Sequence, residues 1–299
     1  MHAEQTRRTT LLASAALLAI AACWGSTFFL IKDLLERVPT LDFLAVRFTI
    51  ASVVLLVVAP RALGRLSPEV RTHAAVLGLL YGVAQILQTA GLAHTPASVS
   101  GFVTGLYVVF TPLLAAAILK TRIPPVTWAA VVLATVGLGV LALDGFSIGY
   151  GELITLTSAV LYALHIVGLG AWSRPQDALG MTILQMVVIA TVCTVATAHD
   201  GIVLPDRTSD WLSVLYMAVV VAALGLFAQT WAQAHLPPTR SAILMSMEPV
   251  FASFFAVWLG GESLTTRLLL GGSMVLVAML TVELAPRRVV EGEVTHIAV

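Results

Sequence analysis

The sequence predicts an all-α membrane protein with ten transmembrane helices, arranged as two inverted five-helix repeats with both termini in the cytoplasm. Composition excludes the main alternatives. Of 299 residues, 59% are apolar and only 11% are charged, whereas a soluble domain carries about 25% charged residues. The mean hydropathy is +0.96. So few charges cannot solvate the surface of a soluble protein, and disorder requires the opposite composition.

Ten apolar stretches are long enough to cross a bilayer, because a helix rises about 1.5 Å per residue and the hydrocarbon layer is about 30 Å thick. They occupy residues 11–31, 40–59, 73–92, 97–119, 125–143, 151–171, 179–198, 211–234, 238–259 and 264–284. The longest connections, near 60–72 and 199–210, contain turn and breaker residues. No segment is long enough for an extramembrane domain.

Basic residues predict which side of the membrane each connection faces. With the N-terminus in the cytoplasm, the inner segments carry eleven Lys and Arg residues, whereas the outer segments carry four, which are Lys32, Arg37, Arg207 and Arg267. Such an excess marks the cytoplasmic side. Residues 1–10 and 285–299 are therefore expected to be a cytoplasmic N-terminus and a cytoplasmic tail.

Two segments, one in each half of the chain, resemble one another. Residues 88–96 read QTAGLAHTP and residues 229–237 read QTWAQAHLP, so that Gln, Thr, Ala, His and Pro recur 141 residues apart. This match predicts a first repeat over 11–143 and a second over 151–284. Apolar segments also match by chance, although Gln, His and Pro match by chance less readily. Because five spans are an odd number, the second repeat is inverted in the membrane, as in many secondary carriers.

Four short motifs occur in a particular order along the chain. They are ACWGSTF at 22–28, Arg47-Phe48, MEPVFA at 247–252 and GESL at 261–264. In this order and spacing they resemble EamA-type members of the drug/metabolite transporter superfamily, over nearly the whole chain. The resemblance implies ten helices around a central cavity, built mainly by the third, fourth, eighth and ninth spans with the first and sixth nearby. The first repeat departs from the pattern, with Arg122 where the second has Glu262, so a role of Glu262 shared by both halves is not expected.

Polar side chains inside the spans are candidates for a transport path, because they destabilise a helix in lipid unless they pair or face water. Tyr81, Gln85 and Gln88 recur at helical spacing and share one helix face. Amide groups are both donors and acceptors, and they suit a neutral or zwitterionic solute. The alternative is that these glutamines bond neighbouring helices to one another. The expected cavity residues are Trp24, Tyr81, Gln85, Gln88, Tyr107, Tyr162, His165, Gln229 and Gln233.

Arg47 and Glu248 are the charged residues that lie deepest in the predicted spans, where an unpaired charge is expensive. The favoured interpretation is a structural anchor, in which the two pair with each other or bind a backbone terminus. The alternative is that Glu248 takes up a proton during transport, next to Pro249, where the helix loses a hydrogen bond.

Small residues in the third and fourth spans predict close helix contacts. Gly78 and Gly82 are four residues apart, and so are Gly101 and Gly105. Such pairs let two helix backbones approach closely in a membrane. We expect them to serve packing.

The resemblance implies a secondary transporter of small organic metabolites that works by alternating access, in the plasma (inner) membrane. Members of the family move amino acids, other metabolites and amphipathic compounds, often outward, and the YddG-like amino acid exporters are one subgroup. We therefore expect export of amino acids, aromatic ones included. A carrier of drug-like amphipathic compounds or of lipid-linked sugars is the alternative.

Other function classes fit the sequence less well. A membrane enzyme would need clustered acids or metal ligands, and a channel would need a polar lining along its whole length. Here the polar residues are scattered and gather near mid-span. Cys23 and Cys193 have no partners at metal-ligand spacing, so no metal and no cofactor is expected. The expected partners are a small-molecule substrate and membrane lipid, without nucleic acid because the net charge is zero. Protons are a candidate coupling ion, and the oligomeric state stays open.

Overall fold

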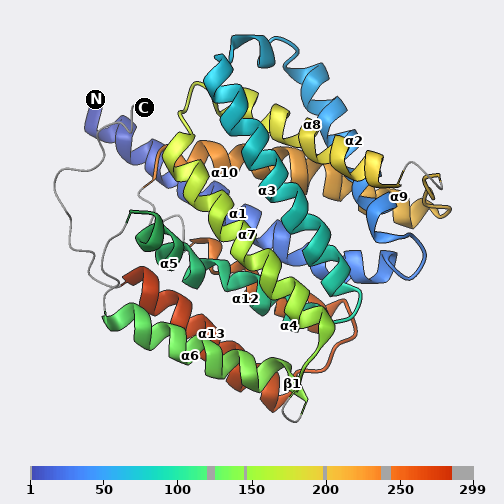
Figure 1. Cartoon of the computed structure of the whole chain (residues 1–299), viewed down its shortest axis with the longest axis vertical. Coiled ribbons are helices and arrows are strands. Elements are labelled where there is room, and N and C mark those ends of the chain that lie inside the picture. Colours follow the sequence, from blue (N-terminus) through green and yellow to red (C-terminus); the bar gives the residue numbers. More distant parts are fainter. Residues whose placement is uncertain (1, 120–124, 145–146, 198–200, 237–243, 285–299) are drawn as a thin grey trace.

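The computed structural model describes residues 2–119, 125–144, 147–197, 201–236 and 244–284. Figure 1 shows that this part of the chain is a bundle of helices. The helices are α1 (His2–Leu34), α2 (Thr40–Val58), η1 (Leu63–Arg65), α3 (Pro68–Leu92), α4 (Ala97–Gly105), α5 (Tyr107–Leu119), α6 (Pro125–Ala142), α7 (Tyr150–Trp172), α8 (Ala178–Thr197), α9 (Thr208–Leu215), η2 (Tyr216–Leu224), α10 (Gly225–Gln233), α12 (Glu248–Trp258) and α13 (Thr266–Leu284). A short antiparallel hairpin of β1 (Leu143–Asp144) and β2 (Ser147–Ile148) joins α6 to α7, and the sequence did not predict it.

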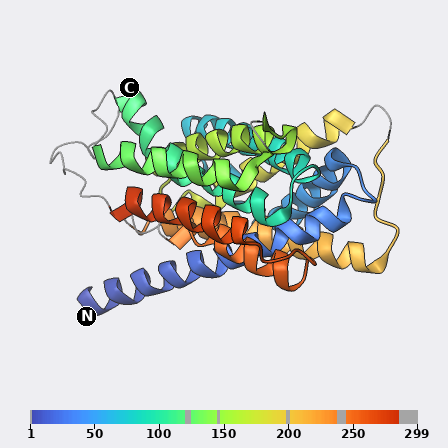
Figure 2. The same ribbon diagram turned by 90° about the horizontal axis from the view of Figure 1, so that it is seen from below.

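Two helices begin earlier than the apolar stretches indicate. Helix α1 begins at His2, so the N-terminal segment expected ahead of the first span is itself helical, and Figure 2 shows this end projecting beyond the bundle. Helix α3 begins at Pro68, where proline fits the first helical position because no N–H is needed there. Ser67 caps this helix, since its hydroxyl oxygen accepts a hydrogen bond from the backbone N–H of Val70 at 3.3 Å.

Three expected spans are interrupted within the described residues. Residues 97–119 form α4 and α5, which separate at Leu106. Residues 211–234 belong to α9, the π-helical segment η2 and α10. The expected span 238–259 lies partly outside the described residues, and its described part contains a turn at 246–247 before α12. Hydropathy does not reveal such breaks, because a turn of one or two residues leaves an apolar stretch apolar.

The length and composition of the helices make the chain a multi-pass membrane protein. Among the described residues, seven helical segments are long and apolar enough to cross a membrane. They are Arg8–Leu34, Thr40–Val58, Pro68–Leu92, Ala97–Ile118, Tyr150–Trp172, Ala178–Thr197 and Thr208–Gln233, and shorter apolar helices cover Pro125–Leu141, Glu248–Trp258 and Thr266–Thr281. Arg122 and the expected tail 285–299 lie outside the described residues.

Helices of the first half pack against helices of the second half. Helix α1 contacts α10 and α12, α2 contacts α8 and η2, and α3 contacts α7 and α8. Helices α6 and α13 lie side by side, as Figure 1 shows. Two glycines mark close approaches: a Cβ atom at Gly78 would lie 2.9 Å from Cα of Gln185 in α8, and one at Gly101 would lie 2.6 Å from Cβ of Ala252 in α12. The packing role predicted for these glycines is therefore confirmed.

Polar side chains link the helices at the end of the bundle where α1 finishes. Arg37 forms salt bridges through Nη2 with Asp210 Oδ1 at 2.9 Å and with Asp33 Oδ2 at 2.6 Å. The hydrogen bonds to Asp210, and then those to Asp33, raise the pKa of Arg37 above its ordinary value. Arg37 therefore stays protonated, and it ties the end of α1 to the start of α9.

Glu262, in the connection between α12 and α13, caps the N-terminus of α4. Its Oε1 accepts a hydrogen bond from the backbone N–H of Ala97 at 2.6 Å, and its Oε2 accepts from the backbone N–H of Ser98 at 3.3 Å and from the Ser98 hydroxyl. The helix dipole favours a carboxylate at this position. Just before α4, the carbonyl of Thr95 accepts a hydrogen bond from Lys32 Nζ at 2.5 Å. Three separate parts of the chain therefore meet at the start of α4.

Candidate functional site

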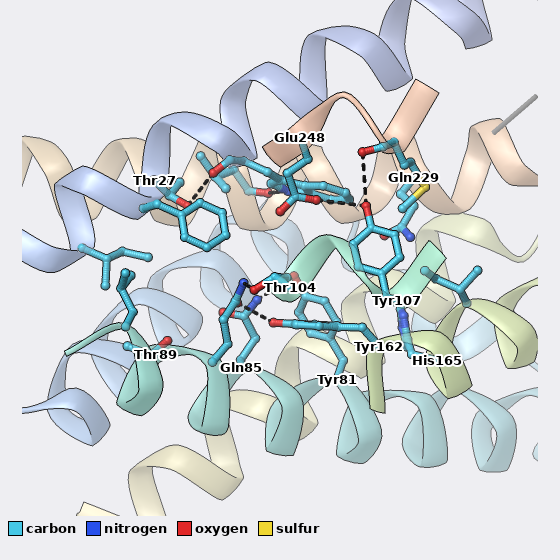
Figure 3. Close-up of a pocket in the computed structure, with 18 of the residues that line it drawn as sticks. Thr27, Tyr81, Gln85, Thr89, Thr104, Tyr107, Tyr162, His165, Gln229 and Glu248 are labelled. Carbon is cyan, nitrogen blue, oxygen red and sulfur yellow. Dashed lines mark hydrogen bonds between the residues drawn. The ribbon is translucent and has the colours of Figure 1, made fainter. Parts of the chain in front are cut away.

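A cavity of about 630 Å³, including the space where it opens to solvent, lies between helices of both halves. Figure 3 shows tyrosine, amide and carboxylate side chains from several helices meeting around it. Each wall comes from a different part of the chain, which only the packing of the two halves brings together.

Most of the expected cavity residues line this cavity. They are Trp24, Tyr81, Gln85, Gln88, Tyr107, Tyr162, His165 and Gln229, joined by the charged residues Arg47 and Glu248. Gln233 lies outside the lining, and its Oε1 is buried without a hydrogen bond among the described residues. Helix α10 ends at this residue, one turn beyond Gln229. That the lining residues bind a substrate stays a prediction.

The lining also includes residues that sequence reasoning missed. They are Thr27, Phe28, Ile31, Thr89, Leu92, Thr104, Ile166, Val221 and Met245. A signal existed for some of them, because Thr27 and Ile31 follow Trp24 on one helix face and Thr89 follows Gln85 by one turn. The other apolar members carried no signal, since their sequence environment matches that of residues facing lipid.

The three glutamines that line the cavity differ in how many hydrogen bonds they make to other side chains. Gln88 Nε2 donates to Thr104 Oγ1 at 3.1 Å and its Oε1 accepts from the Tyr162 hydroxyl at 2.7 Å, so Gln88 links three helices. Gln85 Nε2 donates to the Tyr81 hydroxyl at 3.3 Å. Gln229 is only 3% exposed and has no hydrogen bond among the described residues. Gln88 therefore fits the helix-linking interpretation, whereas Gln229 remains available to a solute.

An aromatic wall faces these amides. The Tyr81 ring lies 5.6 Å from the Tyr162 ring and 5.1 Å from the His165 ring, measured between centroids. His165 Nε2 lies 2.8 Å from Gln185 Oε1, which ties the imidazole to α8. Aromatic rings with polar tips provide flat apolar surfaces beside hydrogen-bonding groups. Within the part of the chain that the structure describes, no group of three or more His, Cys, Asp or Glu side chains could hold a metal ion.

Tyr107 and Glu248 join the two halves at the centre of the site. The Tyr107 hydroxyl donates to Glu248 Oε2 at 3.0 Å and lies 3.3 Å from the carbonyl oxygen of Met245. The two residues are 141 positions apart, which is the offset that aligns Gln88 with Gln229. Each lies at the start of a helix that follows a break, so equivalent positions of the two halves touch each other. Broken helices near the membrane midplane are a common way to build transporter sites.

Of the two anchors considered for Arg47 and Glu248, which were pairing with each other and binding a backbone terminus, the ion pair does not form. Arg47 is 3% exposed, and its Nε donates to the carbonyl of Met217 at 3.2 Å. Trp24 likewise donates through Nε1 to the carbonyl of Val221 at 3.2 Å. Both carbonyls belong to the π-helical segment η2, and π-helical turns are frequent at functional sites. Arg47 is thus anchored by the backbone within a helix rather than by a carboxylate, and the sequence could not reveal this partner.

Comparison with known proteins identifies the family. The sequence profile of the EamA-like transporter family matches residues 11–143 and, a second time, residues 149–284. The chain belongs to the EamA-like transporter family. The resemblance to the drug/metabolite transporter superfamily is confirmed, and the chain is a membrane transporter of small substrates.

The relatives of this EamA-like transporter bear general names. It is 28% identical over 287 residues to an "Uncharacterized transporter" of Archaeoglobus fulgidus, an alignment that covers 94% of this chain and 88% of that protein. It is 25% identical over 259 residues to the "Uncharacterized inner membrane transporter YedA" of Escherichia coli K12, covering 84% of this chain and 83% of that one. A solved crystal structure superposes with a TM-score of 0.65 at 19% identity, covering 90% of this chain and 96% of that chain, which supports the fold alone.

Proposed function

We propose that this EamA-like transporter is a secondary carrier that exports amino acids, aromatic ones included, by alternating access through the cavity. The observation that carries the proposal is the composition of the cavity wall. Amides, tyrosines and one residue of each charge surround a buried space between the two halves. Such a wall offers hydrogen bonds to both ends of an amino acid and flat surfaces to its side chain.

The proposal includes the topology. Ten spans, both termini in the cytoplasm, and inverted repeats over 11–143 and 151–284 stay predictions, in the inner membrane as the name of the Escherichia coli relative suggests. The contact between Tyr107 and Glu248 supports the repeats, because equivalent residues meet at an axis that relates two halves. Reporter fusions at the two ends of the chain test the orientation, and a reporter active only outside the cell would contradict it.

Alternating access requires one end of the cavity to close while the other opens. In the predicted orientation, α1 finishes on the outer side. The links made there by Arg37 with Asp210, and by Glu262 with the start of α4, join helices that must separate for outward release. We propose that these links hold the outer end together in the conformation described here.

Flux measurements in liposomes test the proposed function. Purified protein is reconstituted, and efflux of labelled phenylalanine and leucine is followed with and without a pH gradient. We expect saturable efflux, and we expect Gln229→Ala to lower it about tenfold because a buried hydrogen-bonding group is lost. Gln233→Ala is the matched control, since Gln233 lies on the same helix but outside the cavity lining.

The absence of saturable flux for any amino acid would contradict the proposal. Amphipathic cations and lipid-linked sugars would then be the next solutes to test. Dependence on the pH gradient would identify protons as the coupling ion, whereas equal rates with and without the gradient would indicate facilitated transport.

A further inference from the structure

Two opposite charges face the same cavity without neutralising each other. Arg47 enters from α2 and Glu248 from the start of α12, and both line the cavity. They are 3% and 5% exposed, respectively. No salt bridge joins them, although an unpaired charge at membrane depth is strongly unfavourable. Arg47 and Glu248 could therefore each form an ion pair with a ligand that carries both charges.

The guanidinium group of Arg47 is only partly used by the protein. Its Nε donates to the Met217 carbonyl, and its central carbon lies 5.8 Å from the Phe43 ring and 5.1 Å from the Phe48 ring, measured to the centroids. The two terminal nitrogens make no hydrogen bond among the described residues. These two nitrogens are the pair that binds a carboxylate in a bidentate geometry. The backbone bond and the rings fix the plane of the group and leave this edge unused.

The carboxyl group of Glu248 also keeps one side unused. Oε2 accepts a hydrogen bond from the Tyr107 hydroxyl at 3.0 Å, whereas Oε1 has no partner among the described residues. Figure 3 shows this side chain pointing into the cavity above Gln85 and Tyr162. An ammonium group has three donors and no acceptor, so a carboxylate oxygen is its natural partner.

Tyr81 and Tyr162 line the same cavity as the two charged residues. Their two rings lie 5.6 Å apart, measured between centroids. One cationic and one anionic group thus face a space that two aromatic rings partly enclose. A molecule with one carboxylate, one ammonium group and a net charge of zero matches this arrangement, whereas a simple amine or a simple acid would leave one buried charge unpaired.

We propose that Arg47 binds the α-carboxylate of a zwitterionic amino acid and that Glu248 binds its α-ammonium group. This inference rests on the proposed function and deepens it, because it assigns the two residues that distinguish an amino acid from its amine and from its acid. The aromatic wall and Gln229 then contact the substrate side chain, so the charges set the class of substrate and the wall selects within it.

Binding of matched analogues to the purified wild-type protein tests the assignment without any substitution. The first series is phenylalanine, phenethylamine, which lacks the carboxylate, and 3-phenylpropionate, which lacks the ammonium group. The second is leucine, 3-methylbutylamine and 4-methylpentanoate. We expect at least one amino acid to bind at least about tenfold more tightly than both of its analogues, as loss of one charge-assisted contact requires. Equal binding of an amine or an acid, or no binding of either amino acid, would overturn the assignment.

Two variants then assign the charges individually. Arg47→Gln should remove the preference for the amino acid over its amine, and Glu248→Gln should remove the preference over its acid. Arg65→Gln and Glu69→Gln are matched controls, because both residues are exposed and lie away from the cavity. If either cavity variant folds and keeps the wild-type selectivity, the assignment of that residue is wrong. If neither variant folds, the analogue series on the wild-type protein still decides the proposal.

The outcomes separate this inference from the proposed function. Selective binding of the zwitterion without flux would support the two assignments and contradict the proposed carrier function. In another outcome, amino acids are transported, but amines and acids inhibit the transport as strongly as the amino acid does. This would support the proposed carrier function and overturn the two assignments. A Glu248→Gln variant that loses its response to the pH gradient but keeps its selectivity would make Glu248 a proton site instead.

Discussion

Removal of the Glu262 carboxylate should destabilise the protein although Glu262 lies in a connection between helices. The carboxylate accepts hydrogen bonds from two backbone N–H groups, of Ala97 at 2.6 Å and of Ser98 at 3.3 Å, and from one hydroxyl. Loss of a helix N-cap costs about 0.5–2 kcal/mol, and a hydrogen bond to a charged group contributes about 1.5–3 kcal/mol. Because one bond is long and the side chain is half-buried, we expect Glu262→Ala to lower the free energy of unfolding by about 2–3 kcal/mol.

Glu262→Gln tests how much the charge of the side chain contributes, because the substitution changes the shape of the side chain little. The amide keeps one acceptor oxygen and loses the favourable interaction with the helix dipole, so its effect should be about 1 kcal/mol. Glu36→Ala is the control, because Glu36 is exposed on the same side of the bundle and should shift the free energy of unfolding by less than about 0.5 kcal/mol. Ser98→Ala combined with Glu262→Ala gives a double-mutant cycle, and we expect a coupling energy above about 0.5 kcal/mol.

Equilibrium unfolding in mixed micelles measures these values. The fraction of dodecyl sulfate in dodecyl maltoside is raised, and helix content is followed by circular dichroism. If Glu262→Ala shifts the free energy of unfolding no more than Glu36→Ala does, or if the cycle shows no coupling, the capping argument is refuted. The Glu262 carboxylate would then contribute no stability to the start of α4.

Three further substitutions test other contacts of the fold. Gly101→Val should push α4 away from α12 and lower the yield of folded protein, because overpacking costs about 1–3 kcal/mol, whereas Gly64→Val should be neutral since nothing lies within 4 Å of that site. Arg37 has a raised pKa, so its bridge to Asp210 should persist as pH rises. In Arg37→Lys the melting temperature should instead fall as pH rises above about 10.4, the ordinary pKa of lysine, because the bridge is lost when the amine deprotonates. Wild-type behaviour of the lysine variant would contradict this. Tyr107→Phe removes the hydroxyl that joins the two halves and should slow amino acid efflux while the protein remains folded, and unchanged efflux would contradict a role for that bond.

Much of the architecture could be predicted because membrane helices are specified locally. The length of an apolar stretch predicts a membrane span. Likewise, helical spacing predicts a shared helix face for Tyr81, Gln85 and Gln88. The glycine pairs likewise predicted close helix contacts. The starts of α1 and α3 were less accurate, since charged and polar residues at a helix end extend the helix without adding to hydropathy.

The partners of the polar residues were beyond the sequence, because they depend on how two distant halves pack. Arg47 and Glu248 were expected to pair with each other or to bind a backbone terminus. Instead, Arg47 donates to a carbonyl within the π-helical segment, and Glu248 accepts from Tyr107. The break at Leu106 and the π-helical turns were not apparent from the apolar stretches, and the cap by Glu262 is a contact between distant parts of the chain. The sequence thus determined which segments are apolar enough to cross a membrane and where polar residues interrupt them, because both properties are local. Only the packing of the two halves decided which polar groups bond to each other and which line the cavity without a partner among the described residues.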